Sequence, residues 1–446
     1  MNLTRKEISE KFLKYEKDHN LLYLVIDKVM PWQISRVWLF LSIYESFSPK
    51  KNSPPKKIRE KIMKIQRIIF NSIFNNPFID LKKSETLVFQ SSRKYLVDHT
   101  YIDIYTQYLI DKLRNQHQKV TVYETFVENA DNPLSFLGIL QNKRHLDFIN
   151  IISKFLKKFV KTDFSIAEFE VSKKIEADLK KEFFFEANIS FFFKETIKQF
   201  KAEYLLYDLL FRLKRPNEIF IINSCDKSAL VYAAKKNNII VNELQHGYSS
   251  DKDLISNYPY TEEESLAYFP NRYYIWDNVD MFFAKLPLKR ANILKIPHYH
   301  LENLILKTAN IEKNKACILI ISQPHDTGKL QDIIVNNKDD IKDYEIIYKK
   351  HPVENETAYT NFKNKFVEDK NIKFIDNEES VYVFLKKAHY VIGIASAALF
   401  EAVAFDCRII LLNLPGVEMS FPLLKNSNCK LIDGDDRLIN FLTEEI

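Results

Sequence analysis

The chain has 446 residues, of which 46% are hydrophobic and 28% charged, and its 65 Lys and Arg against 59 Asp and Glu give a net charge of +6. This composition excludes an intrinsically disordered chain, and the length predicts two or three domains. Only six residues are glycine, and neither of the glycine-rich phosphate-binding patterns, GxxxxGKS/T and GxGxxG, occurs, which excludes Walker-type ATPases and fingerprinted dinucleotide enzymes.

The first half of the chain is predicted to open with helices and to continue as alternating strands and helices. Roughly the first 80 residues are helical, with Pro31 near the start of a helix, where its missing N–H is tolerated. Helices are expected at 105–113, at 229–234 and over most of 134–215. Short apolar runs predict the strands Thr86–Gln90, Lys119–Tyr123, Glu218–Asn223, Ile239–Val241 and Arg272–Trp276.

The second half restarts this pattern after a predicted joint at 289–314. Helices are expected at 381–385 and 397–405, and strands are expected at Ala316–Ile321, Tyr344–Tyr348, Ile372–Ile375, Tyr390–Ile392 and Arg408–Leu412. Alternating strands and helices indicate parallel sheets. We therefore predict an α/β chain with a helical amino-terminal region over 1–80, a Rossmann-like domain over 81–290 and a second over 291–446, each binding ligands at the carboxyl ends of its strands.

The four cysteines (Cys225, Cys317, Cys407 and Cys429) lie far apart and form no CxxC pair. This spacing favours free thiols in a reducing cytoplasm over a zinc ribbon or a disulfide framework.

The amino terminus is charged throughout, unlike a secretory signal. The apolar run Val37–Ile43 is far shorter than the ~20 residues of a membrane span. We expect a cytoplasmic protein, soluble or peripheral on the inner face of the membrane.

Two stretches, 49–67 and 155–161, combine basic residues with apolar or aromatic ones. A helix of that composition can lie on an anionic membrane surface. The same spacing also fits a helix whose apolar stripe packs inward and whose charged face is solvated. No nucleic-acid partner is expected, because no RRM, zinc-finger or basic-zipper pattern accompanies the charge.

Polar loops follow three of the predicted strands: Glu243–Gly247, Lys349–Pro352 and Gly393–Ala402. In a chain so poor in glycine, Gly247 and Gly393 at strand ends indicate a positive φ or a close approach of the backbone to a ligand.

The last of these loops leads into a helix that begins at Ser396 and Ala397. Exposed N–H groups and the helix dipole favour a phosphate or carboxylate there. Glu401, about one turn further along, is placed to accept hydrogen bonds from ribose hydroxyls. The alternative is that Ser396 is a plain N-cap and Glu401 a surface acid.

His351 and Pro352 form a pair at the end of another strand, next to Lys349 and Lys350. A histidine there can donate to a phosphate oxygen, and the lysines add positive charge. A structural histidine is the alternative.

The His351–Pro352 pair and the Ser396 helix start resemble GT-B glycosyltransferases of bacterial capsule and lipopolysaccharide synthesis, especially the sialyl-, Kdo- and teichoic-acid-type members. Further matches to a surface-polysaccharide transferase subgroup are Glu243–Gly247, Tyr258-Pro259, Phe269-Pro270, Pro31-Trp32 with Arg36, and Tyr101–Tyr105. The resemblance covers most of the chain. The sequence differs from the family pattern at Ala397, where many relatives have a second Ser or Thr, and at Asp277, where the subgroup often has Gly.

This resemblance implies a GT-B fold, in which two Rossmann-like domains face each other across a cleft. The first domain would hold the acceptor and the second the nucleotide-sugar donor. The resemblance also implies that His351, Ser396 and Glu401 bind the nucleotide part of the donor, with Lys350, Pro352, Gly393 and Ala397 beside them.

Glycosyl transfer needs a base for the acceptor hydroxyl and a charge sink for the departing phosphate. His351, Lys350 and the helix start would form the sink. His246 is the first choice for the base, because Gly247 lets the loop turn and Glu243 is close enough to orient it, and Asp226 is the second choice. No metal site is expected, since Asp251–Asp253 reads DxD but lacks a preceding apolar strand.

The predicted function is a metal-independent glycosyltransferase that moves a sugar from a nucleotide-activated donor, with a CMP-sugar as one candidate, to a growing capsule or lipopolysaccharide glycan or glycolipid. No cofactor is expected besides this nucleotide-sugar co-substrate. Three alternatives stay open: a teichoic-acid-type polyol-phosphate transferase, a sugar-nucleotide 2-epimerase, and a non-catalytic scaffold of polysaccharide assembly.

Overall fold

The computed structural model divides the chain into two compact units. It describes residues 5–47, 58–79, 82–91, 94–97, 100–125, 143–248, 254–259, 266–277, 284–323, 327–351, 354–376, 379–433 and 436–442. Unit 1 runs to His246 and also includes Leu254–Ile275 and Lys285–Ile296. Unit 2 contains the described residues 247–248, 276–277 and 284 and the chain from Pro297 onward.

Unit 1 is built on a seven-stranded sheet in the order β5-β4-β1-β6-β7-β8-β9. Its strands are β1 (Thr86–Phe89), β4 (Val120–Glu124), β5 (Lys143–His145), β6 (Glu218–Ile222), β7 (Ile240–Leu244), β8 (Arg272–Trp276) and β9 (Ile293–Ile296). The pairings from β5 through β8 are parallel. The strands β2 (Tyr95–Val97) and β3 (Thr100–Ile102) form a separate antiparallel hairpin.

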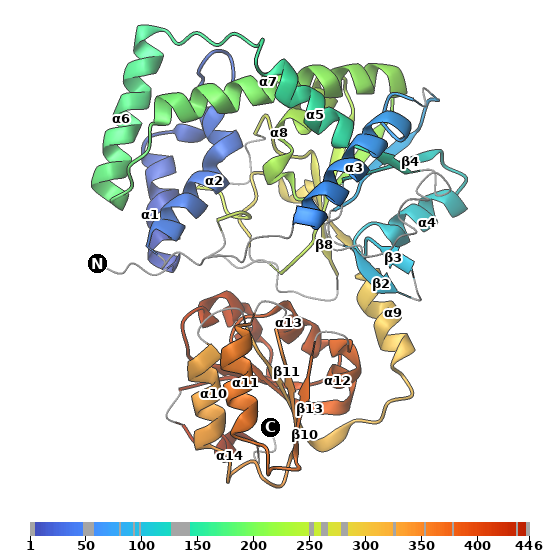
Figure 1. The fold of residues 1–446 in the computed structure, drawn as a ribbon, viewed down its shortest axis with the longest axis vertical. Coiled ribbons are helices and arrows are strands. Elements are labelled where there is room, and N and C mark those ends of the chain that lie inside the picture. Colours follow the sequence, from blue (N-terminus) through green and yellow to red (C-terminus); the bar gives the residue numbers. More distant parts are fainter. Residues whose placement is uncertain are drawn as a thin grey trace. The chain divides into compact units, whose positions relative to one another are not determined.

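Helices surround this sheet (Figure 1). They are α1 (Arg5–Asp18), α2 (Pro31–Ser46), α3 (Ile58–Phe74), α4 (Gln107–Asn115), α5 (Asp147–Leu156), α6 (Ile166–Phe183), α7 (Ile189–Lys214) and α8 (Ser228–Lys236). Short 3-10 helices are η1 (Leu21–Tyr23), η3 (Ser224–Asp226) and η4 (Arg290–Asn292). Ser165 caps α6 in a capping box with Glu168, and Asn188 caps α7.

A buried ion pair joins α1 to α2. Arg36 donates to both carboxylate oxygens of Glu16 at 2.8 Å, and Glu16 also accepts from the indole N–H of Trp32 at 2.7 Å. The guanidinium then donates to the carbonyls of Leu254 and Asn257 at 3.0 and 2.9 Å. The Pro31-Trp32 and Arg36 motif therefore lies in the structural core of the amino-terminal helices.

Unit 2 contains a six-stranded parallel sheet in the order β12-β11-β10-β13-β14-β15. Its strands are β10 (Asn314–Ile321), β11 (Glu345–Lys349), β12 (Ile372–Ile375), β13 (Ala388–Gly393), β14 (Arg408–Leu412) and β15 (Cys429–Ile432). Its helices are α9 (Tyr299–Lys307), α10 (Thr327–Asn336), α11 (Glu356–Asn364), α12 (Val381–Lys387), α13 (Ala397–Val403), α14 (Ile439–Leu442) and the 3-10 helix η5 (Val417–Lys425). Helices α10 and α11 lie on one side of this sheet and α12 on the other (Figure 1).

Both sheets have the strand order of a doubly wound Rossmann fold. Numbered within its own sheet, unit 2 has the order 3-2-1-4-5-6, and unit 1 has 3-2-1-4-5-6-7. In such sheets the strand order reverses between strands 1 and 4, because the later strands are added on the other side of strand 1, and ligands bind at the carboxyl ends of the strands at that point. The order therefore places one candidate site after β1 and β6 in unit 1 and another after β10 and β13 in unit 2.

The predicted fold class is confirmed: the chain has two Rossmann-like parallel-sheet units of the kind that make up the GT-B fold, with added amino-terminal helices. The cleft between domains stays a prediction. Strands 272–276, 372–375 and 408–412 have the predicted bounds.

The described part of the stretch 134–215 is mostly helical, as predicted, with α5, α6 and α7 following the short strand β5. Two local predictions were wrong. Strand β7 runs to Leu244, so Glu243 lies inside a strand and not in the loop that follows it. Helix α13 ends at Val403, two residues before its predicted end.

The four cysteines are all free thiols, as predicted. Over the part of the chain that the structure describes, no helix is both long and apolar enough to cross a bilayer.

Candidate functional site

The loop after β13 lies at the switch point of the unit 2 sheet. Strand β13 pairs with β10, and Gly393 is its last residue. A Cβ at Gly393 would lie 3.0 Å from Leu399 Cδ2 and 3.5 Å from the carbonyl oxygen of Ile321. Neither Gly393 nor Gly247 has a positive φ, so that alternative is wrong for both, and the close approach of the backbone to a ligand stays a prediction. Gly393 instead allows α13 to pack closely onto the strand that precedes it.

Ser396 is the N-cap of α13, and Ala397 is its first residue. The Ser396 hydroxyl accepts a hydrogen bond from the Ala398 N–H at 3.3 Å. The capping role considered for Ser396 is therefore observed.

Glu401 follows one turn later on α13 and is half-buried. Its Oε1 accepts one hydrogen bond, from the Tyr382 hydroxyl at 3.3 Å. Burial raises the pKa of Glu401 to about 7, and the Tyr382 hydrogen bond only partly offsets this. Glu401 is therefore neither fully exposed nor fully buried, and its nucleotide-binding role stays a prediction. A half-buried carboxyl with one weak donor among the described residues can accept further hydrogen bonds from the hydroxyls of a ligand.

Aromatic rings lie next to this carboxyl. Tyr248 stacks on Phe400, with ring centroids 4.6 Å apart and planes 10° apart, and meets Trp276 edge-on at 5.2 Å. The buried Tyr248 hydroxyl has no hydrogen-bond partner among the described residues. Burial raises the pKa of Tyr248 above its ordinary value, and the charge of Glu401 adds to this effect.

Two buried histidines extend the cluster. His298 lies 3.9 Å from the Trp276 ring, and His300 meets the Tyr382 ring edge-on at 6.0 Å. Burial lowers the pKa of His298 to about 3 and that of His300 to about 4, so both imidazoles are neutral at pH 7. Sequence reasoning missed Tyr248, Trp276, His298, His300 and Tyr382; the short Pro297–His300 run, with two histidines, was the available signal.

His351 and Lys350 lie at the end of β11, which is the neighbour of β10. Glu354 holds their loop: its carboxylate accepts from Ser322 Oγ and Tyr348 Oη, both at 2.7 Å, and from the His351 N–H at 3.4 Å. Lys350 pairs with Glu356 and lies over the Tyr359 ring. Pro352 lies outside the described residues. Glu354, which the sequence analysis did not single out, therefore sets the position of His351.

Glu243 and Asp226 come together in unit 1. Glu243 is 4% exposed, and its Oε1 accepts from the Ser224 N–H at 3.2 Å, in the turn that carries Asp226. Burial raises the pKa of Glu243 to about 7, and the charge of Asp226 contributes. Glu243 Oε2 has no hydrogen-bond partner among the described residues. Through this hydrogen bond the buried Glu243 carboxyl contacts the turn after β6, which lies at the switch point of the unit 1 sheet.

His246 follows β7, and its ring meets Tyr105 edge-on at 6.4 Å. Tyr105 is held through Asp103, which accepts from the backbone N–H groups of Ser91 and Tyr105 at 2.5 and 2.9 Å. The Tyr101–Tyr105 motif thus shapes the surroundings of His246.

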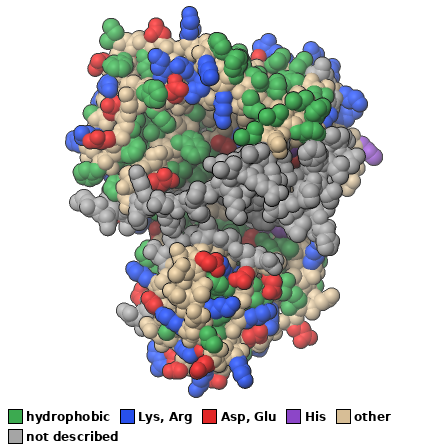
Figure 2. Space-filling view, viewed as in Figure 1, with side chains coloured by type: hydrophobic (Ala, Val, Ile, Leu, Met, Phe, Trp, Pro, Cys, Tyr) green, Lys and Arg blue, Asp and Glu red, His purple; other side chains and the backbone are tan. Residues whose placement is uncertain are grey.

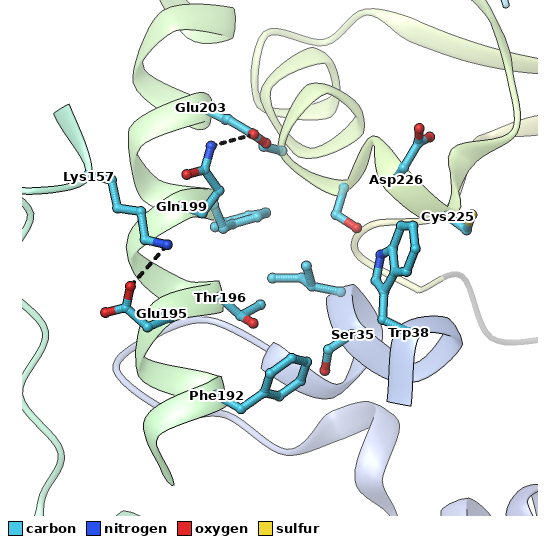
Figure 3. Close-up of a pocket in the computed structure, with 14 residues that line it drawn as sticks. Ser35, Trp38, Lys157, Phe192, Glu195, Thr196, Gln199, Glu203, Cys225 and Asp226 are labelled. Carbon is cyan, nitrogen blue, oxygen red and sulfur yellow. Dashed lines mark hydrogen bonds and ion pairs between the residues drawn. The ribbon is translucent and has the colours of Figure 1, made fainter. Parts of the chain in front are cut away.

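Asp226 also lines a cavity of about 390 Å³ in unit 1. Figure 3 shows Trp38 and Asp226 on one side of it and the α7 side chains Glu195, Gln199 and Glu203 on the other. The complete lining is Ile34, Ser35, Trp38, Lys157, Phe192, Glu195, Thr196, Gln199, Phe200, Glu203, Cys225, Asp226, Ser228 and Ala229.

Hydrogen bonds and ion pairs fix the polar wall of this cavity. Gln199 Nε2 donates to Glu203 Oε1 at 2.7 Å, and Lys157 pairs with Glu195 at 3.0 Å. Burial raises the pKa of Glu203 and raises that of the Cys225 thiol to about 12, which leaves this thiol protonated at pH 7. Within the described residues, no group of three His, Cys, Asp or Glu side chains could hold a metal ion.

No protein family and no curated protein matches the chain. Among solved structures, it is similar to the UDP-GlcNAc 2-epimerase of Methanocaldococcus jannaschii at 10% identity and a TM-score of 0.47, over 82% of this chain and 92% of that one. It is also similar to the Neisseria meningitidis UDP-GlcNAc 2-epimerase bound to UDP-GlcNAc, at 13% identity and a TM-score of 0.48, over 81% of this chain and 90% of that one. MurG of Acinetobacter baumannii is similar at 10% identity and a TM-score of 0.45, over 81% of this chain and 89% of that one. TM-scores this low transfer neither an activity nor a substrate.

Proposed function

We propose that this chain is an enzyme that acts on a nucleotide-activated sugar, with the nucleotide bound at the switch point of the unit 2 sheet. The observation that carries the proposal is the half-buried Glu401 carboxyl, which accepts a hydrogen bond from Tyr382 beside the stacked rings of Tyr248 and Phe400. A carboxylate near this point of a Rossmann-like sheet is suited to accept hydrogen bonds from ribose hydroxyls. The Tyr248 hydroxyl supplies a second polar group.

The phosphate would lie near the loop after β13 and the end of β11. Backbone N–H groups near Ser396 and Ala397 and the His351 imidazole are the proposed donors, with Gly393 keeping α13 close to the strand and Pro352 following His351. Lys350 would contribute positive charge, which its contact with the exposed Glu356 carboxylate leaves partly available. These groups would stabilise the charge that develops on a departing phosphate.

Unit 1 would bind the second substrate, a saccharide. Its cavity of about 390 Å³ falls in the size range of small-molecule sites. Trp38 offers a half-exposed ring for the apolar face of a sugar, while Gln199, Glu203 and Asp226 offer partners for hydroxyl groups. Following the resemblance described above, the proposed acceptor is a capsule or lipopolysaccharide glycan or glycolipid.

The proposed reaction is glycosyl transfer. A base removes the proton of an acceptor hydroxyl, the oxygen bonds to the anomeric carbon, and the bond from that carbon to the phosphate oxygen breaks, which releases the nucleotide with the electron pair. Asp226, which lines the cavity, and His246 are the proposed bases, and Glu243 is the proposed positioning residue for Asp226. Comparing Asp226→Asn with His246→Gln identifies the base, because one substitution should lower turnover at least 100-fold while nucleotide affinity is unchanged.

Calorimetric titration with UDP, CMP and UDP-GlcNAc tests nucleotide binding. We expect one of them to bind, and Glu401→Gln to weaken that binding roughly 10- to 100-fold, because a hydrogen bond to a charged acceptor is lost. The matched control is Glu302→Gln, at an exposed position of α9 in the same unit, which should leave affinity unchanged. Equal affinity of the Glu401 variant would exclude this carboxyl from the site, and binding of none of the ligands would favour the scaffold alternative.

The same protein, incubated with nucleotide sugars and CDP-polyols, separates the remaining activities. Nucleotide release that requires a glycan acceptor supports transfer. Nucleotide sugar that keeps its nucleotide but exchanges its C2 proton with deuterated water indicates the 2-epimerase alternative, and consumption of a CDP-polyol indicates the polyol-phosphate alternative.

A further inference from the structure

Helix α3 carries a row of exposed apolar side chains. Ile65, Ile69 and Ile73 are 57%, 50% and 56% exposed, and the adjacent Phe74 is 56% exposed. Residues four apart lie on the same face of a helix. The row is therefore an apolar stripe on the solvent side of α3.

Helix α5 and the turn after it carry a second row with the same spacing. Ile151, Phe155 and Phe159 are 41%, 55% and 68% exposed. The Phe155 and Phe159 rings contact each other edge-on with centroids 5.1 Å apart. Neither ring is packed into the interior of unit 1.

The two helices are held together by contacts away from these rows. Phe78 meets Phe148 edge-on at 5.8 Å, and Asn71 donates to Asp147 at 3.4 Å. Figure 2 shows the apolar side chains gathered over α3 and α5 on the near face of the molecule. The α3–α5 face is defined here as Ile65, Ile69, Ile73, Ile151, Phe155 and Phe159.

The charge close to this face is mainly basic. Lys154, Lys158 and Lys161 are exposed on or just after α5. Lys157 is paired with Glu195 of α7 at 3.0 Å. The sequence contains no Asp or Glu over 148–162, which carries four Lys, or over 61–79, which carries two Lys and one Arg. A surface that is apolar and mainly basic is complementary to an apolar and anionic partner.

We infer that the α3–α5 face docks on the surface of an anionic lipid bilayer. Exposed apolar clusters mark interaction surfaces, and helices that lie in a bilayer interface combine Phe and other large apolar residues with Lys. Lysine is depleted in protein–protein interfaces, which makes a protein partner the weaker fit. Anionic headgroups attract the lysines, while Ile and Phe side chains enter the boundary between headgroups and acyl chains.

Vesicle co-sedimentation of the full chain tests this inference. We expect binding to vesicles of equal parts phosphatidylglycerol and phosphatidylcholine, and much weaker binding to phosphatidylcholine alone. The double variant Phe155→Ser with Phe159→Ser should reduce binding at least about tenfold, and Lys154→Gln with Lys158→Gln should reduce it on the order of tenfold. Because these side chains are exposed, the variants should keep the thermal unfolding midpoint of the wild type.

The matched control replaces Phe184 and Leu306, which are 66% and 74% exposed outside this face, with Ser. It should bind vesicles as the wild type does. Equal binding by the Phe155 and Phe159 variant, or no binding to anionic vesicles, overturns the inference. Concentration-dependent dimers that vanish in this variant, without vesicle binding, would overturn it in favour of a second copy of the chain. None of these readouts requires a nucleotide, so the result is independent of the proposed function.

Discussion

Glu243 is a buried carboxyl in unit 1 and Glu401 a half-buried one in unit 2, and the surroundings raise the pKa of each to about 7. Both follow from local chain geometry. Glu243 is carried into the interior by strand β7, and Glu401 lies on a short helix that packs closely onto β13 because residue 393 is glycine. Groups that titrate near neutrality are suited to proton transfer or to binding hydroxyl groups.

Glu401→Gln should change the pH dependence of stability. With a folded-state pKa of about 7 against an ordinary value of 4.5, the folded protein keeps a proton that the unfolded chain has released. Wild-type stability therefore falls as the pH rises from about 4.5 to about 7, and the cost of the ionised group approaches about 3 kcal/mol above that window. The variant lacks this contribution.

Urea unfolding of wild type and variant at about pH 5 and about pH 8 measures the difference. The free energy of unfolding of the variant, relative to that of the wild type, should be higher at the higher pH. Glu243 is present in both proteins, so its own titration cancels in the comparison. A stability difference that stays constant with pH would mean that the Glu401 carboxyl does not titrate in a buried environment.

Helix α2 depends on the ion pair between Arg36 and Glu16, both of which are almost fully buried. Arg36→Met would leave the Glu16 carboxylate in the interior with the Trp32 N–H as its one remaining side-chain donor among the described residues. We expect a loss of about 3 to 5 kcal/mol in the free energy of unfolding, because a buried charge without its partner is strongly destabilising.

Chemical denaturation measures this loss, and Arg437→Met is the matched control. Arg437 pairs with Asp340 on the surface, so its removal should leave the unfolding midpoint unchanged. If both substitutions have the same small effect, the α1–α2 pair is not a structural element of unit 1.

Close packing of α13 onto β13 gives another prediction at the scale of elements. In Gly393→Ala the new Cβ would lie 3.0 and 3.2 Å from the δ-carbons of Leu399, which is fully buried. We expect a loss of about 1 to 2 kcal/mol, together with weaker nucleotide binding because Glu401 lies on the displaced helix.

Gly328→Ala provides the comparison, because a Cβ at Gly328 in α10 meets nothing within 4 Å. That substitution should be neutral or should stabilise by up to about 1 kcal/mol. Thermal unfolding of the two variants is the measurement. Equal stabilisation of both would contradict the close packing at residue 393.

At the scale of the whole molecule, the two sheets were predictable because apolar strands alternating with helices leave few topologies. The predicted strand at 372–375 matched β12, and the strand predicted at 408–412 matched β14. The β5 strand was not predicted. It is only three residues long and polar, with the sequence Lys-Arg-His, and pairing with β4 rather than its own pattern makes it a strand.

The candidate site was also predictable only in part, because some of its residues are brought together by contacts between distant parts of the chain. Gly393, Ser396 and Glu401 lie within one short segment of the sequence, and strand-end reasoning placed that segment at one edge of a sheet. Tyr248 and Trp276 precede the joint in the sequence, yet both belong to unit 2. No local pattern reveals contacts such as the stacking of Tyr248 on Phe400, which join residues about 150 positions apart.

A crystal structure of the protein with a bound nucleotide tests the central claim most directly. We predict that the nucleoside lies beside the carboxyl ends of β10 and β13, with a ribose hydroxyl within about 3 Å of a Glu401 oxygen. A nucleotide bound elsewhere, with no contact to Glu401, would contradict the account.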